Sequence, residues 1–95
     1  MAAYWIAHVV VKDPQQYTKY TALAPAAFAR YGARFLARGG KTQVLEGVMR
    51  PERSVVIEFD SFDDALRCYH SQQYQQAMAE RMGVAFVEII VVEGV

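Results

Sequence analysis

The sequence is short of the features that mark secreted and membrane proteins. Cys68 is the only cysteine among 95 residues, so no disulfide can form within the chain. Asparagine is absent, which removes any N-glycosylation site. No apolar run approaches the roughly 20 residues that a membrane span requires, and no basic segment precedes an apolar stretch at the start of the sequence. We therefore expect a cytoplasmic protein without a membrane partner.

Neither sign of charge is in excess. Ten basic and ten acidic residues give a formal net charge of zero, so nothing attracts nucleic acid and we expect no such partner. A neutral chain is also prone to self-association. With 54% hydrophobic residues and this length, the chain is expected to fold as one domain over residues 1–95.

The pattern of apolar residues predicts an alternation of strands and helices. Strands are expected at 4–12, at 33–46 with a bend at Gly39-Gly40, at 53–60 and at 84–93. A hairpin between 33–38 and 42–46 is the alternative to the bent strand. Helices are expected at 14–31, 62–69 and 72–82, with Asp13, Ser61 and Ser71 as their caps and a kink or break at Pro25. This order predicts an α+β, ferredoxin-like β-α-β-β-α-β fold with an antiparallel sheet in the order 4-1-3-2.

Alternation along the strands gives the predicted sheet two unlike faces. The uncharged set comprises Trp5, Ala7, Val9, Val11, Val55, Ile57, Phe59, Ala85, Val87, Ile89 and Val91. The mixed set comprises Tyr4, Ile6, His8, Val10, Ser54, Val56, Glu58, Asp60, Phe86, Glu88, Ile90 and Val92. Neither set suits water, yet helices cover only one face of such a sheet. We therefore predict a homodimer joined sheet to sheet.

The mixed face brings together groups that could move protons. His8, Glu58 and Glu88 lie on three neighbouring strands, within reach of one another or of arginines such as Arg34, Arg38 or Arg53. A histidine and a carboxylate with shifted pKa values are candidates for acid–base catalysis. The alternative is a satisfied polar network inside the dimer interface.

Tyrosines and arginines predict a small-molecule site. Five tyrosines are expected on helices: Tyr17, Tyr20, Tyr31, Tyr69 and Tyr74. Converging rings would line a pocket between helices and sheet, although core or rim positions explain them equally well. Arg81 facing inward would bind a carboxylate or enolate oxygen. The predicted catalytic residues are His8, Glu58 and Tyr69, and the predicted substrate-binding residues are Arg38, Arg53, Tyr17, Tyr74 and Arg81.

No cofactor or metal signature is present. Gly39-Gly40-Lys41-Thr42 resembles the end of a phosphate-binding loop, but Phe35 stands where the first glycine is needed and no helix is expected to follow. Cys68 and His70 lie two residues apart on a predicted helix and point in different directions. We predict neither a metal site nor a cofactor.

The sequence resembles the small bacterial proteins of domain-of-unknown-function family 1330, in the dimeric α+β barrel superfamily. The matching residues are Tyr4-Trp5, Asp13, Tyr17, Tyr20, Arg38-Gly39-Gly40, Glu46-Gly47, Arg53, Glu58-Phe59, Ala65, Tyr69-His70-Ser71, Tyr74, Arg81 and Glu93-Gly94. His70 departs from the pattern, in which asparagine is usual. The resemblance implies a ferredoxin-like subunit whose sheets pair across a dimer, and it implies no established reaction.

Two functions remain open. One is a cofactor-independent enzyme that acts on a compact organic acid or aromatic by proton transfer, isomerisation, elimination or oxygenation, as similar barrels include cofactor-free monooxygenases and isomerases. The other is a non-catalytic dimeric module that binds a metabolite or supports another protein. One fold hosts many functions, so the resemblance does not decide between them.

Overall fold

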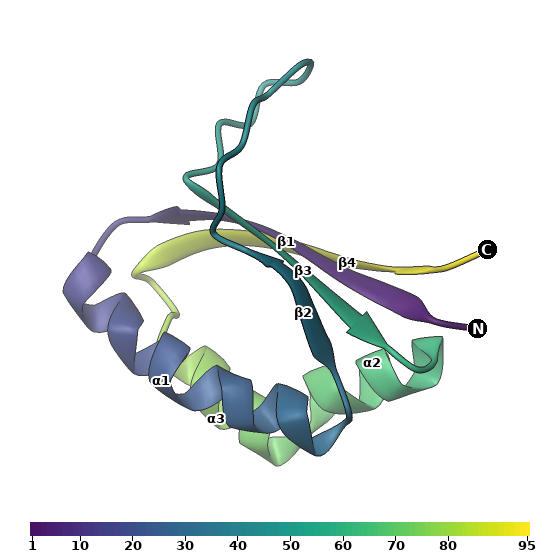
Figure 1. Cartoon of the computed structure of the whole chain (residues 1–95). Coiled ribbons are helices and arrows are strands. Elements are labelled where there is room, and N and C mark those ends of the chain that lie inside the picture. Colours follow the sequence, from purple (N-terminus) through teal and green to yellow (C-terminus); the bar gives the residue numbers. More distant parts are fainter.

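The chain forms a four-stranded sheet with helices on one side (Figure 1). The computed structural model describes residues 1–95. The elements in chain order are β1 (Ala3–Val11), α1 (Pro14–Arg30), β2 (Arg34–Arg38), β3 (Arg53–Phe59), α2 (Phe62–His70), α3 (Gln72–Ala79) and β4 (Ala85–Glu93). None of the three helices has the length and apolar character needed to cross a membrane.

The sheet has the predicted topology. Its strand order is β2-β3-β1-β4, and each neighbouring pair is antiparallel. The central strand β1 places Trp5 opposite Ile57 of β3 and Val91 of β4. The ferredoxin-like prediction is therefore confirmed, including the two β-α halves.

The two faces of the sheet also divide as predicted, and the structure adds which face the helices cover. The uncharged set faces the helices, where Trp5, Ile57 and Phe59 are at most 1% exposed. Trp5 packs edge-on against Phe28 and Tyr74 at ring-centroid distances of 5.0 and 5.1 Å. Burial of these large apolar rings is the main source of stability. The mixed set forms the uncovered side, here called the open face.

Helix boundaries follow their predicted caps with two corrections. The side chains of Asp13, Ser61 and Ser71 each accept a backbone N–H of the first turn that follows. Helix α1 is not broken at Pro25 but continues to Arg30, because a proline removes one hydrogen bond while packing against α3 and Trp5 holds the rest. Helix α3 ends at Ala79 rather than 82, and turns connect it to β4.

The second strand has 5 residues, about a third of the length expected from the sequence. Strand β2 ends at Arg38, and residues 39–52, here called the arm, form neither the bent continuation of that strand nor a hairpin. The arm rises from the sheet on the side away from the helices (Figure 1). Leu45 and Val48 on it are 88% and 98% exposed. With no neighbouring strand to pair with, a segment rich in polar residues and glycine does not extend the sheet.

The predicted bulge lies earlier in the chain than the glycines. The pairing of β2 with β3 shifts between Phe35 and Ala37, so Leu36 is the extra residue. Because side chains alternate along a strand, Phe35 and Arg38 would ordinarily lie on opposite faces. The bulge cancels that offset, so that Phe35 pairs with Ile57 and Arg38 with Val55, both on the helix-covered face.

Candidate functional site

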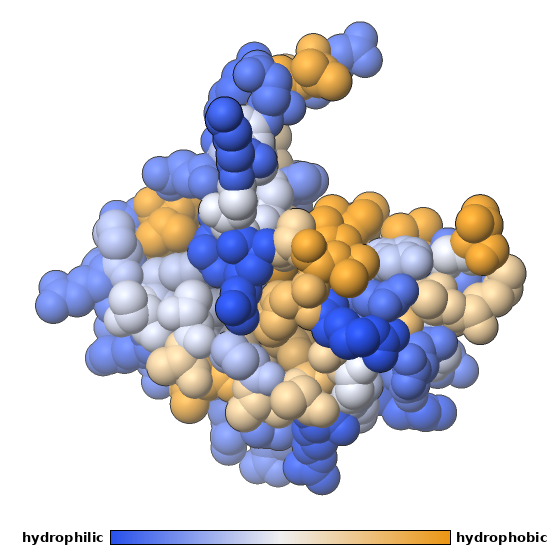
Figure 2. Space-filling model, viewed as in Figure 1, coloured by the Kyte–Doolittle hydropathy of each residue, from blue (hydrophilic) through white to orange (hydrophobic).

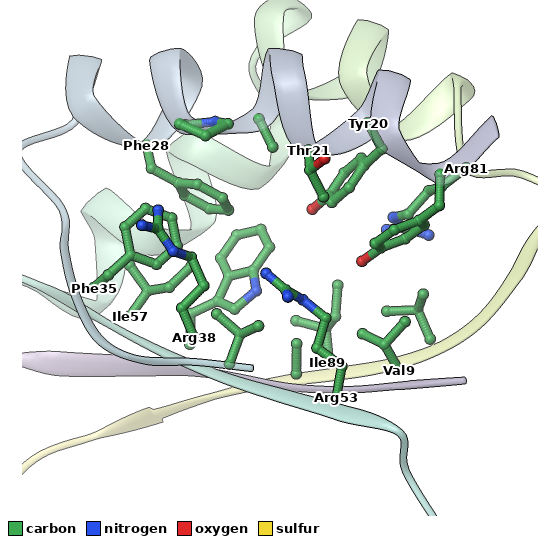
Figure 3. A pocket seen from close by; sticks show the side chains of 17 residues that line it. Val9, Tyr20, Thr21, Phe28, Phe35, Arg38, Arg53, Ile57, Arg81 and Ile89 are labelled. Atoms are coloured by element: carbon green, nitrogen blue, oxygen red, sulfur yellow. The ribbon is translucent and has the colours of Figure 1, made fainter. Parts of the chain in front are cut away.

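A cavity of about 170 Å³ lies between α1 and the sheet (Figure 3). Its walls are mostly aromatic and aliphatic, and three arginines project into it. The lining residues are Trp5, Ala7, Val9, Tyr17, Tyr20, Thr21, Ala24, Pro25, Phe28, Phe35, Arg38, Arg53, Val55, Ile57, Arg81, Val87 and Ile89. No carboxylate and no histidine is among them.

One face of α1 provides the upper wall. Tyr17, Thr21, Ala24 and Phe28 recur at helical spacing, so a single stripe of the helix faces the sheet. Pro25 belongs to the same wall and has no N–H, so it cannot donate the helical hydrogen bond to the carbonyl of Thr21. The wall is therefore apolar with a few hydroxyl and carbonyl oxygens.

The three arginines reach the cavity by different routes. Arg53 begins β3 and faces the cavity by simple alternation with Val55 and Ile57. Arg38 faces it because of the bulge at Leu36. Arg81 comes from the turn after α3 and lies beside Tyr20 at one end of the cavity (Figure 3). None of the three forms a salt bridge, so their positive charges are not neutralised within the chain.

Arg81 is the most unusual of these groups, because it is charged and only 7% exposed. Its Nη2 donates a hydrogen bond to the Tyr74 hydroxyl at 3.3 Å, and its guanidinium lies 5.3 Å from the centre of the Tyr20 ring. Its Nε is buried and has no hydrogen-bond partner. Burial alone would lower the pKa of Arg81, but the tyrosine oxygens outweigh burial and the pKa is raised. A permanent cation with an unused donor thus lies beside the cavity.

Tyr17 and Tyr20, near Arg81, stay protonated at neutral pH. Burial raises the pKa of Tyr17 and, far more strongly, that of Tyr20, whose hydroxyl lies 2.8 Å from the Tyr74 hydroxyl. A phenol with a raised pKa does not act as a base near neutral pH. These hydroxyls are therefore hydrogen-bonding groups.

Gly39, at the root of the arm, leaves space for the guanidinium of Arg53 because it has no side chain. Gly39 has a φ of +72°, and a Cβ built on it would lie 2.6 Å from Nη1 of Arg53. Its N–H donates to the carbonyl of Ser54 at 2.9 Å, which holds the arm root against β3. Any larger residue here would push the guanidinium away and would strain the backbone.

The predicted substrate-binding residues come together, and the predicted catalytic residues do not join them. Arg38, Arg53, Arg81 and Tyr17 line the cavity. Tyr74 does not line it but accepts a hydrogen bond from Arg81. Tyr69 faces a separate groove beyond Trp5, where its hydroxyl donates to Sδ of Met78 at 3.6 Å. His8 and Glu58 lie on the open face, with the whole sheet between them and the cavity.

The open face holds polar pairs close to what the sequence predicts. Nδ1 of His8 lies 2.9 Å from Oγ of Ser54, and Glu88 is its neighbour on β4. Glu58 accepts from Nε of Arg34 at 2.9 Å and from the hydroxyl of Tyr4 at 3.3 Å. Of the three arginines considered as partners for this face, Arg34 is the one that contacts Glu58, while Arg38 and Arg53 lie on the other side.

Several cavity residues were not singled out from the sequence as site residues. Thr21, Pro25 and Phe28 lie in the same helical stripe as Tyr17, so periodicity alone would have identified them. Phe35 could not be assigned to a face, because nothing in the sequence marks the bulge at Leu36. Its ring also lies 4.5 Å from the Arg38 guanidinium, a cation–π contact that orients that side chain.

Sequence comparison identifies one family. The model of DUF1330, a domain of unknown function, matches residues 2–95. No curated protein is detectably similar in sequence to this chain.

Solved structures with the same fold are distant in sequence. A protein of unknown function from Rhodopseudomonas palustris has a TM-score of 0.80 at 15% identity, covering 99% of this chain and 82% of that one. SnoaB, a cofactor-independent oxygenase from Streptomyces nogalater, has a TM-score of 0.70 at 14% identity, covering 99% and 93%. A dimeric ferredoxin-like protein of unknown function from Jannaschia sp. CCS1 has a TM-score of 0.75 at 8% identity, covering 99% and 100%. At these identities the likeness shows the fold alone.

Proposed function

The chain belongs to the DUF1330 family, and we propose that its cavity binds a compact aromatic or other apolar organic acid as the anion. The observation that carries this proposal is Arg81, a buried cation with no counter-charge and a free Nε beside an apolar cavity. Burying a charge without a partner is costly. A carboxylate would neutralise it, and Arg53 on the opposite wall would share the anion.

The aromatic walls define the rest of the ligand. Phe28, Phe35 and Trp5 present rings to the cavity, and a flat apolar group packs well among them. The volume of about 170 Å³ limits this part of the ligand to about one ring. Benzoate and phenylpyruvate are therefore suitable probes.

Calorimetric titration tests the binding. We expect benzoate to bind and the neutral isostere benzamide to bind at least 10-fold more weakly, because charge-assisted hydrogen bonds are about twice as strong as neutral ones. Arg53→Gln is expected to weaken benzoate binding. Arg30 is an exposed arginine at the end of α1, and Arg30→Gln is expected to leave benzoate binding unchanged. Equal affinity for benzoate and benzamide would contradict the proposal.

Enolate stabilisation is the second candidate function, and the protonated tyrosines beside the arginines favour it. In an arylpyruvate, the carbon next to the carbonyl loses a proton to water and its electron pair moves onto the carbonyl oxygen. That oxyanion would be held by Arg53, Arg81 and the hydroxyl of Tyr20 or Tyr17. This is cofactor-independent proton transfer, with the cavity supplying electrostatic stabilisation.

Deuterium exchange into phenylpyruvate, followed by NMR, tests this chemistry. We expect the protein to accelerate exchange and Tyr20→Phe to slow it, with Arg30→Gln as the unaffected control. Loss of exchange in Glu58→Gln or His8→Ala would instead place the reaction at the open face, as the sequence predicts. If the wild-type protein does not accelerate deuterium exchange, enolate stabilisation is contradicted and only the binding function stands.

We further propose that two copies pair through their open faces. Phe86 and Ile90 are 61% exposed and Val92 is 45% exposed on this face of one chain. Figure 2 shows apolar side chains gathered beside the root of the arm and near its tip. The Jannaschia neighbour is described as dimeric. Pairing would bury His8, Glu58 and Glu88 together, so their predicted catalytic role belongs to this interface.

Sedimentation velocity tests the dimer. The wild type is expected to be dimeric at micromolar concentration, and Ile90→Asp is expected to be monomeric because a carboxylate would enter the apolar interface. Leu23→Asp, on the outer side of α1, is the matched control and should remain dimeric. A wild-type monomer would contradict the proposal.

We also propose that the protein acts in the bacterial cytoplasm. Its single thiol is buried, and burial raises the pKa of Cys68 to about 12, which keeps it protonated and unreactive. A chain with one inert thiol gains nothing from an oxidising compartment. Fractionation of cells that express the full-length protein at native levels tests this location.

A further inference from the structure

A second hollow lies on the helix side of the sheet, between α2, α3 and β4. It is an open groove of about 600 Å³, and nine of its ten lining residues are hydrophobic. The lining residues are Trp5, Phe62, Leu66, Tyr69, Met78, Arg81, Met82, Val87, Ile89 and Val91. Arg81 is its only charged residue.

The groove and the cavity meet at shared residues. Trp5, Arg81, Val87 and Ile89 line both, so the guanidinium of Arg81 stands at the boundary between them. Arg81 therefore lies at the junction of a small aromatic cavity and a larger apolar groove, and its buried Nε has no hydrogen-bond partner within the chain. A ligand anion held there has apolar space on either side.

The groove is larger than the cavity, and the difference in volume affects which ligands each can hold. Pockets for small molecules usually measure about 300–1,000 Å³. The cavity, at about 170 Å³, falls below this range, whereas the groove, at about 600 Å³, falls within it. A ligand larger than one ring exceeds the cavity, and the adjoining groove has room for the remainder.

The side chains of the groove suit an apolar chain of variable shape. Met78 and Met82 are unbranched and adapt to irregular ligands. Leu66 and Met82 are 38% and 64% exposed at its edge, and covering them removes apolar surface from water. Because the groove lies on the helix side, pairing of the open faces would leave it uncovered.

We propose that the groove binds the apolar tail, an alkyl chain or additional rings, of the same acid whose anionic group is held at Arg81. This inference rests on the proposed function, since it assigns a second subsite to the same ligand. The carboxylate lies at Arg81, and the tail passes over Ile89 and Val91 towards Leu66. The ligand class is thereby an amphipathic monocarboxylic acid longer than a single ring.

Calorimetric titration with hexanoate, octanoate and decanoate tests the subsite. Each added methylene that enters the groove should tighten binding about 3–4-fold, which follows from about 0.8 kcal/mol per buried methylene. Leu66→Glu should abolish this gain and leave hexanoate affinity within about 2-fold of the wild type. Leu23→Glu, a matched change at an exposed leucine outside both hollows, should retain it.

The outcomes separate the two proposals. If benzoate and hexanoate bind but chain length has no effect, the groove inference is overturned and the proposed function stands. If no acid binds, both are overturned. Should Leu66→Glu fail to fold, as judged by circular dichroism, Met82→Gln at the exposed edge takes its place. A change of association state in Leu66→Glu, with no change in decanoate affinity, would show a protein contact and would also overturn the inference.

Discussion

The two faces of the sheet are made from the same strands, yet charged side chains have partners on the open face and lack them on the helix side. On the open face, Glu58 is bound by Arg34 and Tyr4, and His8 is bound by Ser54, so polar groups satisfy one another. On the helix side, Arg38, Arg53 and Arg81 face an apolar cavity without a single carboxylate. The number of charged residues alone therefore does not locate a site. An unpaired charge in a buried position does.

The largest expected difference between the faces is in folding stability. Trp5→Ala on the helix side should lower the free energy of unfolding by about 3–5 kcal/mol, because it leaves a cavity among Phe28, Phe59 and Tyr74. Ile6→Ala on the open face should cost about 1 kcal/mol in the monomer, since Ile6 is only partly buried. Urea unfolding at low protein concentration measures both, and similar losses would contradict the assignment of the core.

Arg81→Met should separate stability from binding. Removing a buried cation without a counter-charge should leave the free energy of unfolding unchanged or raise it by about 1 kcal/mol. The same change should lower the affinity for benzoate about 10–100-fold, the range expected for loss of a hydrogen bond to a charged group. Urea unfolding and calorimetry on one preparation test both effects. A strongly destabilised variant would show that Arg81 is a structural residue.

Gly39→Ala should affect the cavity through Arg53. The added methyl would lie within 2.6 Å of Nη1, and an L-residue is strained at this φ. We expect about 1–2 kcal/mol of destabilisation and a several-fold loss of benzoate affinity. Gly83→Ala is the control, since its φ is also positive but no atom lies within 4 Å of its Cβ. If both variants bind benzoate equally, Gly39 does not position Arg53.

At neutral pH the smallest effect is expected from the ionisation of Cys68, which alters stability only at alkaline pH. On the helix side burial raises the pKa of Cys68 from 9.0 to about 12, whereas on the open face Glu58 raises the pKa of Arg34 by accepting its hydrogen bond. Because the unfolded thiol ionises first, stability should be unaffected below pH 9 and should fall as pH rises from 9 to about 12, by at most about 1.4 kcal/mol per unit.

Cys68→Ala isolates this contribution. The decline that begins near pH 9 should disappear, while the decline above pH 10 from Tyr17 and Tyr20 should remain, since burial raises the pKa of both phenols. Thermal unfolding across this pH range measures the slopes. An unchanged slope just above pH 9 would show that Cys68 ionises as freely in the folded protein as in the unfolded one.

Local patterns made most of the fold predictable. Alternation on β1, β3 and β4 fixed which residues share a face, and the caps at Asp13, Ser61 and Ser71 fixed where helices begin. The expected strand at 42–46 was wrong, because an extended pattern forms a strand only beside a partner. Of the kink or break expected at Pro25, the break was wrong, because tertiary packing holds α1 together as one helix.

The candidate site was predictable only in part. Arg53 follows from alternation in β3, and Tyr17 follows from helical spacing in α1. Arg38 could not be placed, because the bulge at Leu36 has no glycine or proline to mark it. The groove beside Leu66 was not foreseen either, since it depends on how far α2 and α3 extend over β4.

By itself the sequence determined the order of the elements, the two faces of each strand and the surplus of apolar residues on the open face. These properties depend on residues close together in the chain, where geometry repeats every two or 3.6 positions. Only the tertiary structure decided which face the helices cover, that Arg38, Arg53 and Arg81 line one cavity, and that one of them is buried without a counter-charge. Burial and charge pairing join distant parts of the chain, so they exist only once it has folded.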